Sequence, residues 1–270
     1  MLPFNLHRPT AIDSIQSTLA GATDPKFLAG GMTLLPSMKL GLIAPTDLID
    51  FTALPGIAEI SSKDRTVTIG AAATHAAVAR DSTVGNLCPA LGRLAGKIGD
   101  RHVRNRGTIG GSVANNDPAA DYPAAILALG ATIRTDKREM AAEDFFLGIF
   151  ETALEEHELI TSFEFETPEQ AAYAKFPHPA SGYALAGVFI CRTGSSVRVA
   201  VTGAGSEGAF RLTELEALLE EDFSAETADR VDLSSFDFFE DRNGSRAYRE
   251  NLVRVMARRA ISEIAGKNAA

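Results

Sequence analysis

The sequence predicts an α+β protein in which short helices and strands are interleaved along the chain. Three observations support this fold class. Residues 26–51 contain a strand, a Gly-Gly turn, a helix and a second strand, which is the pattern of a βαβ unit. Two pairs of short strands meet at turns near residues 63–64 and 136–137. Three apolar strands between residues 173 and 202 precede two helices, which predicts a sheet backed by helices.

Length and charge restrict the class of protein. The 270 residues can bury a substantial core and suffice for two or three subdomains. A net charge of −9 argues against a nucleic-acid surface or a polybasic membrane patch. The opening residues, MLPFNLHRPTAIDSIQ, hold no apolar signal region, and no apolar run approaches the length of a membrane span. We therefore expect a soluble, cytoplasmic protein with no nucleic-acid partner and no membrane insertion.

The cysteine content restricts the cofactor chemistry. Cys88 and Cys191 are the two cysteines, and each lies among apolar neighbours. Two thiols alone cannot ligate an iron–sulfur cluster or a structural zinc ion, and they define no disulfide framework. We expect buried free thiols in a reducing compartment.

The first 55 residues predict a βαβ subdomain with a candidate anion-binding turn. Gly30 and Gly31 follow a short buried strand and precede a helix that begins near Leu34, with Pro36 tolerated in its first turn. Such a turn presents backbone N–H groups to a negatively charged ligand. The other predicted elements are a strand and a helix within residues 4–21 and the strands 27–29 and 47–51.

Residues 56–167 predict a second subdomain, and a boundary near residues 167–172 separates it from a C-terminal module. The second subdomain is expected to contain hairpins at 57–61 with 66–69 and 131–135 with 139–141, helices at 75–80 and 86–98, a loop at 142–158 and a strand at 159–166. The C-terminal module is expected to contain strands at 173–176, 184–192 and 197–202 and helices near 211–221 and 245–265.

A second glycine-rich stretch, RNRGTIGGSVANNDPAADYPAA at residues 104–125, is too polar to be core. Its three glycines let the chain turn tightly and lie directly against a ligand. Asp117 and Asp121 add two carboxylates just before a helix with Pro123 in its first turn. Exposed N–H groups in a glycine turn suit a phosphate or pyrophosphate, and the alternative is a solvated surface loop.

A third glycine motif lies at residues 203–208, where GAGSEG matches G-x-G-x-x-G after a strand and before a helix. Taken alone, it would indicate a Rossmann dinucleotide site. That site also requires a second strand that ends in an acidic residue about twenty residues later. Residues 220–230, EEDFSAETADR, are too polar for such a buried strand. We therefore interpret the motif as a strand-to-helix turn that needs glycine.

The first two glycine stretches, AGGMTLLPSMKLGL and HVRNRGTIGGSVANNDPAADYPAA, together resemble the FAD-binding subunit of the molybdenum hydroxylases. This family includes the medium subunit of aerobic carbon monoxide dehydrogenase and the FAD-binding subunit of xanthine dehydrogenase. FNLHRPTAIDSI, EHELITSFEFETP and YAKFPHPASGYALAGVFI resemble other parts of the family. The resemblance implies a two-lobed FAD-binding domain of the PCMH/vanillyl-alcohol-oxidase-like type, with subdomains 1–55 and 56–167, followed by a carbon monoxide dehydrogenase flavoprotein-like domain at 168–270.

The same resemblance implies which residues contact FAD. The first stretch would wrap the diphosphate with backbone amides, and the second would close on it from the other side. Asp121 matches an acidic position that contacts the cofactor, and Ile160 and Lys175 match further flavin-site contacts. Tyr183 matches a tyrosine that lies against the isoalloxazine ring. The matching positions of the two stretches are Ala29, Gly30, Gly31, Met32, Thr33, Leu34, Thr108, Ile109, Gly110, Gly111 and Ser112.

Several of these residues have structural alternatives. Asp117 and Asp121 could cap the helix that follows them. Lys175 could be an ordinary lysine on an edge strand. We expect no metal site, because Asp100, His102 and the two aspartates lack ligand spacing on rigid elements. The sequence shows no acid/base pair that would indicate a catalytic residue.

The resemblance implies an electron-transfer subunit that binds FAD noncovalently, since the family's covalent attachment residues have no evident counterpart here. Molybdopterin and a [2Fe–2S] centre are then expected on a large and a small partner subunit, in an (αβγ)2 assembly. Substrate oxidation would occur on a partner, and electrons would leave to an external acceptor such as a quinone, oxygen or NAD. The alternatives are a stand-alone FAD-dependent oxidoreductase with its own small-molecule substrate and a scaffold that has lost its flavin.

Overall fold

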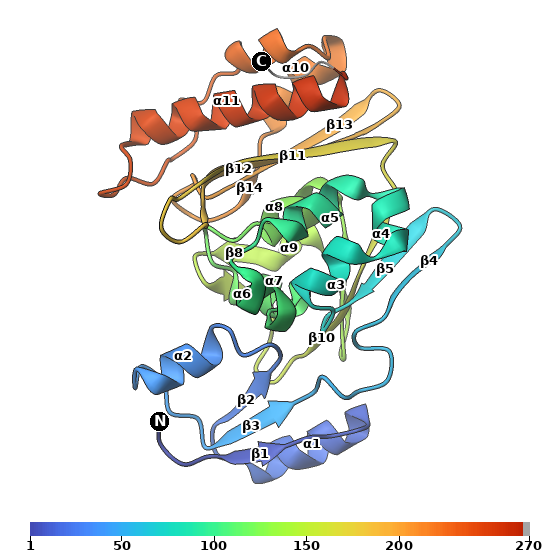
Figure 1. Ribbon diagram of the computed structural model, residues 1–270, viewed down its shortest axis with the longest axis vertical. Helices are drawn as coiled ribbons and strands as arrows, with labels where there is room; N and C mark the ends of the chain where they lie inside the picture. The colour runs from blue at the N-terminus through green and yellow to red at the C-terminus, as the bar shows by residue number, and fades with distance from the viewer. Residues whose placement is uncertain (267–270) are drawn as a thin grey trace.

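The computed structural model describes residues 1–266 and shows three layers stacked along the long axis of the molecule (Figure 1). Each layer is built on one of the three larger β-sheets. Helices and strands alternate along the chain, which confirms the predicted α+β class. Among the helices of residues 1–266, none has both the length and the apolar character that a membrane crossing requires.

The N-terminal layer contains the βαβ unit that the sequence predicts. Its three strands are parallel and lie in the order β1-β3-β2. Ile15 of α1 and Ile49 of β3 share a small core, because the apolar face of the amphipathic α1 covers the sheet. The elements are β1 (Asn5–His7), α1 (Ile12–Gly21), β2 (Pro25–Leu28), α2 (Leu34–Lys39) and β3 (Asp47–Asp50).

The middle layer combines an antiparallel sheet, in the order β4-β5-β10-β6-β7, with a group of short helices. Tyr122, Ile126 and Phe163 are fully buried in the core of this layer. The strands are β4 (Ile60–Lys63), β5 (Thr66–Gly70), β6 (Thr132–Thr135), β7 (Glu139–Ala141) and β10 (Ile160–Glu166). The helices are α3 (His75–Arg80), α4 (Ser82–Leu87), α5 (Pro89–Gly96), α6 (Arg101–Arg106), α7 (Ile109–Asn115), α8 (Tyr122–Ala128) and α9 (Ala142–Phe145).

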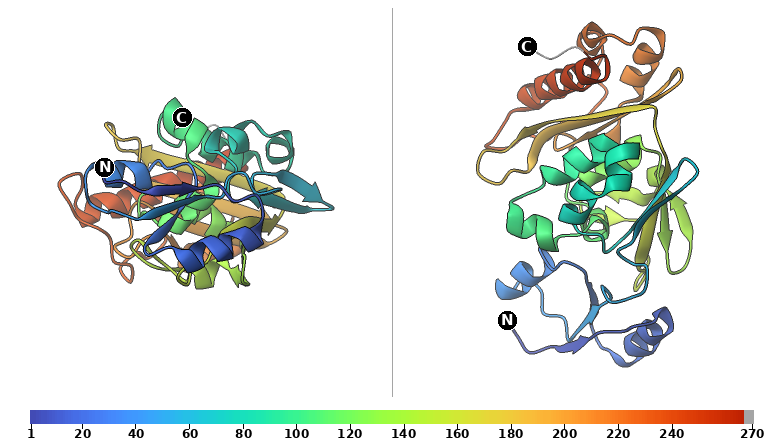
Figure 2. Two further views of the ribbon diagram at one scale, coloured as in Figure 1. Left: turned by 90° about the horizontal axis from the view of Figure 1, so that it is seen from below. Right: turned by 45° about the vertical axis from the view of Figure 1, so that its right-hand side comes forward.

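The C-terminal layer is an antiparallel sheet that is buried on both faces. Helix α11 covers one face, and helices of the middle layer cover the other (Figure 2). Val188 and Ile190 of β12 enter the core under α11, whereas Phe189 enters the core of the middle layer. Burial on both faces explains the uninterrupted apolar run of β12. The elements are β11 (Gln170–Pro177), β12 (Ala184–Thr193), β13 (Ser196–Thr202), β14 (Phe210–Arg211), α10 (Thr213–Glu221), η1 (Ala225–Asp229) and α11 (Arg246–Ile264).

Because the middle core takes in residues of the C-terminal sheet, the two layers share one packing unit. The domain limits at residues 55 and 167 therefore stay predictions. The third glycine motif connects β13 to the short strand β14, and α10 begins only at Thr213, so the motif is not the direct strand-to-helix turn that the sequence predicts. Gly203 has φ +80°, and a Cβ there would lie 2.4 Å from the carbonyl oxygen of Ala184. Glycine is thus required for local packing.

Several predicted elements differ from those in the structure. The expected helix 86–98 is two helices, because Pro89 forces Cys88 out of helical geometry (φ −146°, ψ 68°) and starts α5. The expected loop 142–158 contains α9 and a small hairpin of β8 (Phe146–Gly148) and β9 (Glu151–Thr152). The first strand of the first hairpin is β4, which begins at Ile60 and not at Ile57.

Candidate cofactor-binding cleft

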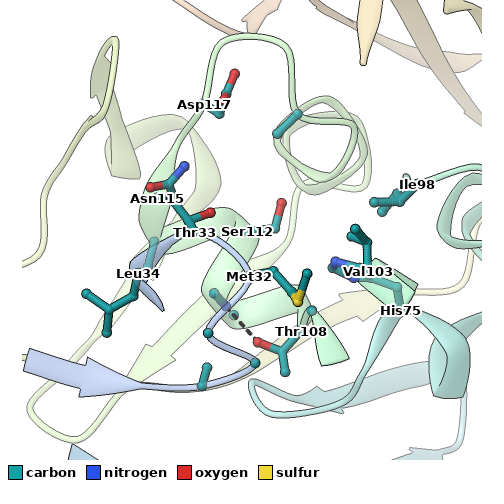
Figure 3. Close-up of a pocket in the computed structure, with 18 of the residues that line it drawn as sticks. Met32, Thr33, Leu34, His75, Ile98, Val103, Thr108, Ser112, Asn115 and Asp117 are labelled. Atoms are coloured by element: carbon teal, nitrogen blue, oxygen red, sulfur yellow. Dashed lines mark hydrogen bonds between the residues drawn. The ribbon is translucent and has the colours of Figure 1, made fainter. Parts of the chain in front are cut away.

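A cleft of about 890 Å³ lies between the N-terminal and middle layers and reaches the C-terminal sheet (Figure 3). It brings together both glycine stretches and several segments that are distant in sequence. Of the residues predicted for the FAD site, Ile109 and Lys175 do not line the cleft, and both side chains are buried. Those that line it are Ala29, Gly30, Gly31, Met32, Thr33, Leu34, Thr108, Gly110, Gly111, Ser112, Asp121, Ile160 and Tyr183.

The first glycine stretch, Gly30–Thr33, connects β2 to α2 and has four backbone N–H groups that find no acceptor within residues 1–266. Gly31 has φ +71°, a conformation that favours glycine. A Cβ on Gly31 would meet Leu35 and Leu28, so this glycine is needed for the shape of the turn and not to leave space in the cleft. Backbone donors without partners are costly unless solvent or a ligand satisfies them, and an anionic ligand suits four adjacent N–H groups.

The second glycine stretch differs from its prediction. Residues 109–115 are helix α7, and Thr108 is its N-cap. The backbone N–H of Gly110 donates to the carbonyl oxygen of Ala71 (2.9 Å), and the N–H of Gly111 donates to Thr108 Oγ1 (3.0 Å, Figure 3). Ile109 and Ser112 are also paired through their N–H groups. Residues 109–112 therefore offer a ligand a close approach to the backbone, but no free amides.

The two stretches touch each other. A Cβ on Gly30 would lie 1.9 Å from the carbonyl oxygen of Arg106, and a Cβ on Gly111 would lie 3.6 Å from Cβ of Ala29. Glycine at position 30 thus lets the N-terminal layer approach the middle layer closely, whereas a Cβ on Gly111 would make only an ordinary van der Waals contact with Ala29. Both stretches thus line the same cleft, and their predicted contacts with the FAD diphosphate stay predictions.

Asp121 is held by a buried polar cluster. It is 4% exposed, its carboxylate lies 2.9 Å from Lys175 Nζ, and Oδ1 accepts a hydrogen bond from the Tyr173 hydroxyl. Burial raises the pKa of Asp121, and the Lys175 ammonium and the Tyr173 hydroxyl oppose that rise. The Asp121 side chain makes no capping hydrogen bond to α8, so the helix-cap alternative is wrong. Although β11 is an edge strand, the Lys175 side chain is 3% exposed and is not the solvated lysine of the other alternative.

Tyr173 is a residue of this cluster that the sequence analysis missed. Lys175 pairs with Gly187 on β12, and Tyr173 lies two residues away on the same face of β11. A Cβ on Gly187 would lie 2.5 Å from the Tyr173 hydroxyl oxygen. Gly187 thus leaves the space that lets this hydroxyl reach Asp121. The signal in the sequence is a glycine inside an apolar strand, which marks a close approach.

His75 also lines the cleft, although the sequence suggests only a helix-start residue. Thr74 caps α3 by accepting a hydrogen bond from the backbone N–H of Ala77, which fixes His75 as the first helical residue. The His75 side chain is buried against Tyr122, with 5.4 Å between ring centroids, and its Nδ1 has no hydrogen-bond partner within residues 1–266. Burial, with a smaller contribution from the charge of Arg104, lowers the pKa of His75 to about 4. The imidazole is neutral at pH 7.

Glu158 is a second cleft residue that the sequence analysis missed, and its side chain is fully buried. Burial opposes its ionisation, but Arg138, the backbone N–H of Glu155 and Thr135 lower its pKa to about 2.

Figure 3 shows Thr33, Ser112, Asn115 and Asp117 on one side of the cleft and Met32, Ile98, Val103 and His75 on another. Within residues 1–266, no three His, Cys, Asp or Glu side chains come together as a metal site.

The chain is similar to several known proteins over its whole length. The family described as the FAD binding domain in molybdopterin dehydrogenase matches residues 2–167. The nicotine 6-hydroxylase medium subunit of Paenarthrobacter nicotinovorans is 31% identical over 94% of this chain and 95% of its own. The carbon monoxide dehydrogenase medium chain of Hydrogenophaga pseudoflava is 31% identical over 97% of this chain and 98% of its own. A solved structure of carbon monoxide dehydrogenase from that organism, which lacks the Mo-pyranopterin moiety of the molybdenum cofactor, covers 100% of both chains at 31% identity with a TM-score of 0.88.

The cleft and its unpaired backbone donors suit a bound cofactor, and the similarity over the whole chain identifies a cofactor-binding subunit of an oxidoreductase. The chain belongs to the family of FAD binding domains in molybdopterin dehydrogenases, and its cofactor is FAD. The resemblance and the cofactor predicted from the sequence are therefore confirmed. The individual contacts with FAD stay predictions.

Proposed function

We propose that this chain is the medium subunit of a molybdenum hydroxylase and passes electrons from a [2Fe–2S] partner subunit, through FAD, to an external acceptor. FAD supplies the redox chemistry, because it takes up electrons singly and releases them in pairs. The observation that carries the proposal is the cleft, in which the N–H groups of Gly30–Thr33 find no partner within the described residues. The whole-chain similarity to subunits named as medium subunits or chains supports the same function.

The two walls of the cleft would hold different parts of the interaction with FAD. We assign the diphosphate to the N–H groups of Gly30–Thr33, because four adjacent donors match its charge and oxygen atoms. The second stretch would bring the glycine backbone at Gly110 and Gly111 into van der Waals contact with FAD, and Gly111 faces Ala29 of the first stretch. Asp121 would contact the cofactor from a position fixed by Lys175, so Lys175 would act through Asp121. Ile160 and Tyr183 complete the proposed wall.

We further propose an (αβγ)2 assembly in the cytoplasm. The large subunit would carry the molybdenum cofactor and oxidise the substrate, and the small subunit would carry the [2Fe–2S] centre. Cys88 and Cys191 are both buried and free, which suits a reducing compartment and leaves no exposed thiolates for a cluster on this chain. FAD would be bound noncovalently.

Replacing Gly31 tests the diphosphate assignment. Gly31→Val should weaken FAD binding by on the order of 100-fold, the equivalent of losing about two hydrogen bonds to a charged group. The matched control is Gly41→Val, because Gly41 also has a positive φ of +72° but a Cβ there would meet nothing within 4 Å. FAD titration of both purified variants, followed by flavin absorbance, measures the difference. Equal affinities would remove the turn from the site.

The electron path is tested in the complex with its partner subunits. The complex would be mixed anaerobically with one candidate substrate at a time. The names of its relatives suggest four: carbon monoxide, glyceraldehyde, nicotine and xanthine. With the active substrate, we expect the spectrum of the reduced [2Fe–2S] cluster to appear before the absorbance band of the flavin bleaches. In a complex with the Gly31→Val chain, the [2Fe–2S] cluster should still become reduced, but electron transfer to an added acceptor should stop. A chain that oxidises a substrate without partners would instead support the stand-alone oxidoreductase.

A further inference from the structure

The segment 178–183 connects β11 to β12, and its residues 180–183 form part of the wall of the cleft on the side of the C-terminal sheet. Ala180, Ser181, Gly182 and Tyr183 all line the cleft, and Tyr183 is 48% exposed. This segment lies outside every helix and strand, although the pairing of β11 with β12 extends to its two ends. Contacts within the segment therefore add to the strand pairing in holding Tyr183 at the cleft.

His178 makes those contacts from the start of the segment. Its Nδ1 accepts hydrogen bonds from the backbone N–H groups of Ala180 (3.2 Å) and Ser181 (3.3 Å). Its backbone carbonyl oxygen accepts from Gly182 N–H (2.9 Å), and its N–H donates to the carbonyl oxygen of Tyr183 (2.7 Å). The side chain thus does for this turn what an Asn or Asp side chain does in an Asx-turn, where it accepts from the backbone two residues later.

The tautomer of His178 follows from its partners. Nδ1 accepts two N–H groups and so carries no proton, which assigns the proton to Nε2. Nε2 lies 3.2 Å from Asn243 Oδ1 and donates to it. Asn243 cannot turn its amide around freely, because its Nδ2 donates to Asp241 Oδ2 (2.8 Å). The carbonyl oxygen of Asn243 is therefore the atom that faces His178.

The cluster continues into the core of the C-terminal layer. Arg249 of α11 is 3% exposed and lies 2.8 Å from Asp241 Oδ1. Its Nη1 donates to the carbonyl oxygens of Leu185 (3.1 Å) and Gly203 (2.7 Å). Leu185 is two residues beyond Tyr183, so both ends of the segment are attached to the same buried cluster. A buried cluster with a fixed geometry gives His178 a rigid support.

We propose that His178 is a positioning residue that holds Tyr183 against the FAD cleft and that Asn243 fixes the tautomer it needs. The proposal rests on the proposed function for the identity of the ligand. His178 does not line the cleft and acts through the backbone of residues 180–183. Its role is to set how far the bound cofactor is shielded from solvent at this side of the cleft.

Two variants separate the acceptor function of His178 from its bulk. His178→Ala removes the Nδ1 acceptor, and His178→Asn restores an acceptor that can reach the N–H of Ala180. The matched control is His102→Ala, which removes an exposed histidine of α6 that does not line the cleft. Amide hydrogen exchange of residues 180–183, in the full chain, should be on the order of 10-fold faster in His178→Ala. His178→Asn should recover most of the protection, and His102→Ala should match the unaltered chain.

Shielding of the cofactor is the readout that a purely structural role would not change. Quenching of the fluorescence of bound FAD by iodide should increase several-fold in His178→Ala. In His178→Asn, the quenching should fall back to its level in the unaltered chain. In a Tyr183→Ala background, His178→Ala should add no further quenching, because both changes act through the same side chain. Unchanged exchange in His178→Ala, no recovery in His178→Asn, or additive quenching would each overturn the proposal. If no variant and not even the unaltered chain binds FAD, the proposed function fails, while the exchange measurement still decides the role of His178.

Discussion

The two glycine stretches of the cleft have similar compositions but opposite hydrogen-bond states. In Gly30–Thr33, the backbone N–H groups find no partner within residues 1–266. In residues 109–112, each backbone N–H is already paired, to Ala73, Ala71 or Thr108. The first stretch can therefore supply donors to a ligand, whereas the second can supply only a close surface.

The difference arises from what each glycine meets. Gly110 packs directly on the backbone after β5, since a Cβ there would lie 2.6 Å from the carbonyl oxygen of Ala71. That contact ties the start of α7 to the sheet and uses its amides. The turn at Gly31 contacts mainly side chains of its own layer, Leu28 and Leu35, so its amides stay available. A glycine-rich stretch thus indicates close approach, and only its surroundings decide whether its amides are free.

The contact between the two stretches gives the largest expected effect. In Gly30→Ala, the new Cβ would lie 1.9 Å from the Arg106 carbonyl oxygen, and backbone atoms cannot yield as a side chain end can. We expect the free energy of unfolding to fall by about 3 kcal/mol and FAD to be lost, because the two layers must separate. Urea unfolding and FAD titration measure both effects. Gly21→Ala is the control, since a Cβ there meets nothing within 4 Å; an unchanged urea midpoint in Gly30→Ala would show that the layers are not in fixed contact.

The support beneath the second stretch gives a comparable but pH-dependent effect. The backbone N–H of His75 donates to the Gly107 carbonyl oxygen (2.9 Å), and burial lowers the pKa of its ring to about 4 from the usual 6.5. The unfolded chain therefore binds a proton that the folded chain excludes between these two values. The contribution of His75 to the free energy of unfolding is fully present above pH 6.5, and this free energy falls by up to about 3 kcal/mol as the pH drops to 4.

Comparing unfolding curves of the unaltered chain and His75→Gln between pH 7 and 4 isolates this contribution. The difference between the two free energies should change across that window, because only the unaltered chain carries the buried imidazole. His102→Gln, at an exposed position, should leave the pH dependence as it is. A constant difference between the unaltered chain and His75→Gln would mean that the imidazole is not held neutral by the fold.

Local patterns predicted much of this molecule, and long-range contacts account for what they missed. The βαβ unit, the apolar strand β12 and the meeting of the glycine stretches follow from spacing, composition and family resemblance. The pairing of the Ile109 and Gly110 amides does not, because their partners Ala73 and Ala71 lie more than thirty positions earlier in the chain. The hydrogen bond from Tyr173 to Asp121 depends on space left by Gly187 on a neighbouring strand. The break at Pro89 was available from the sequence, since proline restricts the residue before it.

Gly111 gives the smallest effect and separates the two stretches most directly. Gly111→Ala adds a methyl group beside Thr108 Oγ1 (3.0 Å) without requiring a positive φ, and alanine is the better helix former, so we expect stability within about 1 kcal/mol of the unaltered chain. FAD affinity should fall about 10-fold, because the methyl group occupies the space through which the cofactor approaches the backbone. Gly85→Ala in α4 is the matched control, as a Cβ there has open space and lies outside the cleft. Titration of both variants with FAD decides whether the second stretch contacts the cofactor. A tenfold loss of FAD affinity in Gly111→Ala alone requires contact through a surface without free amides. Equal FAD affinities in the two variants would leave the first stretch as the sole diphosphate contact.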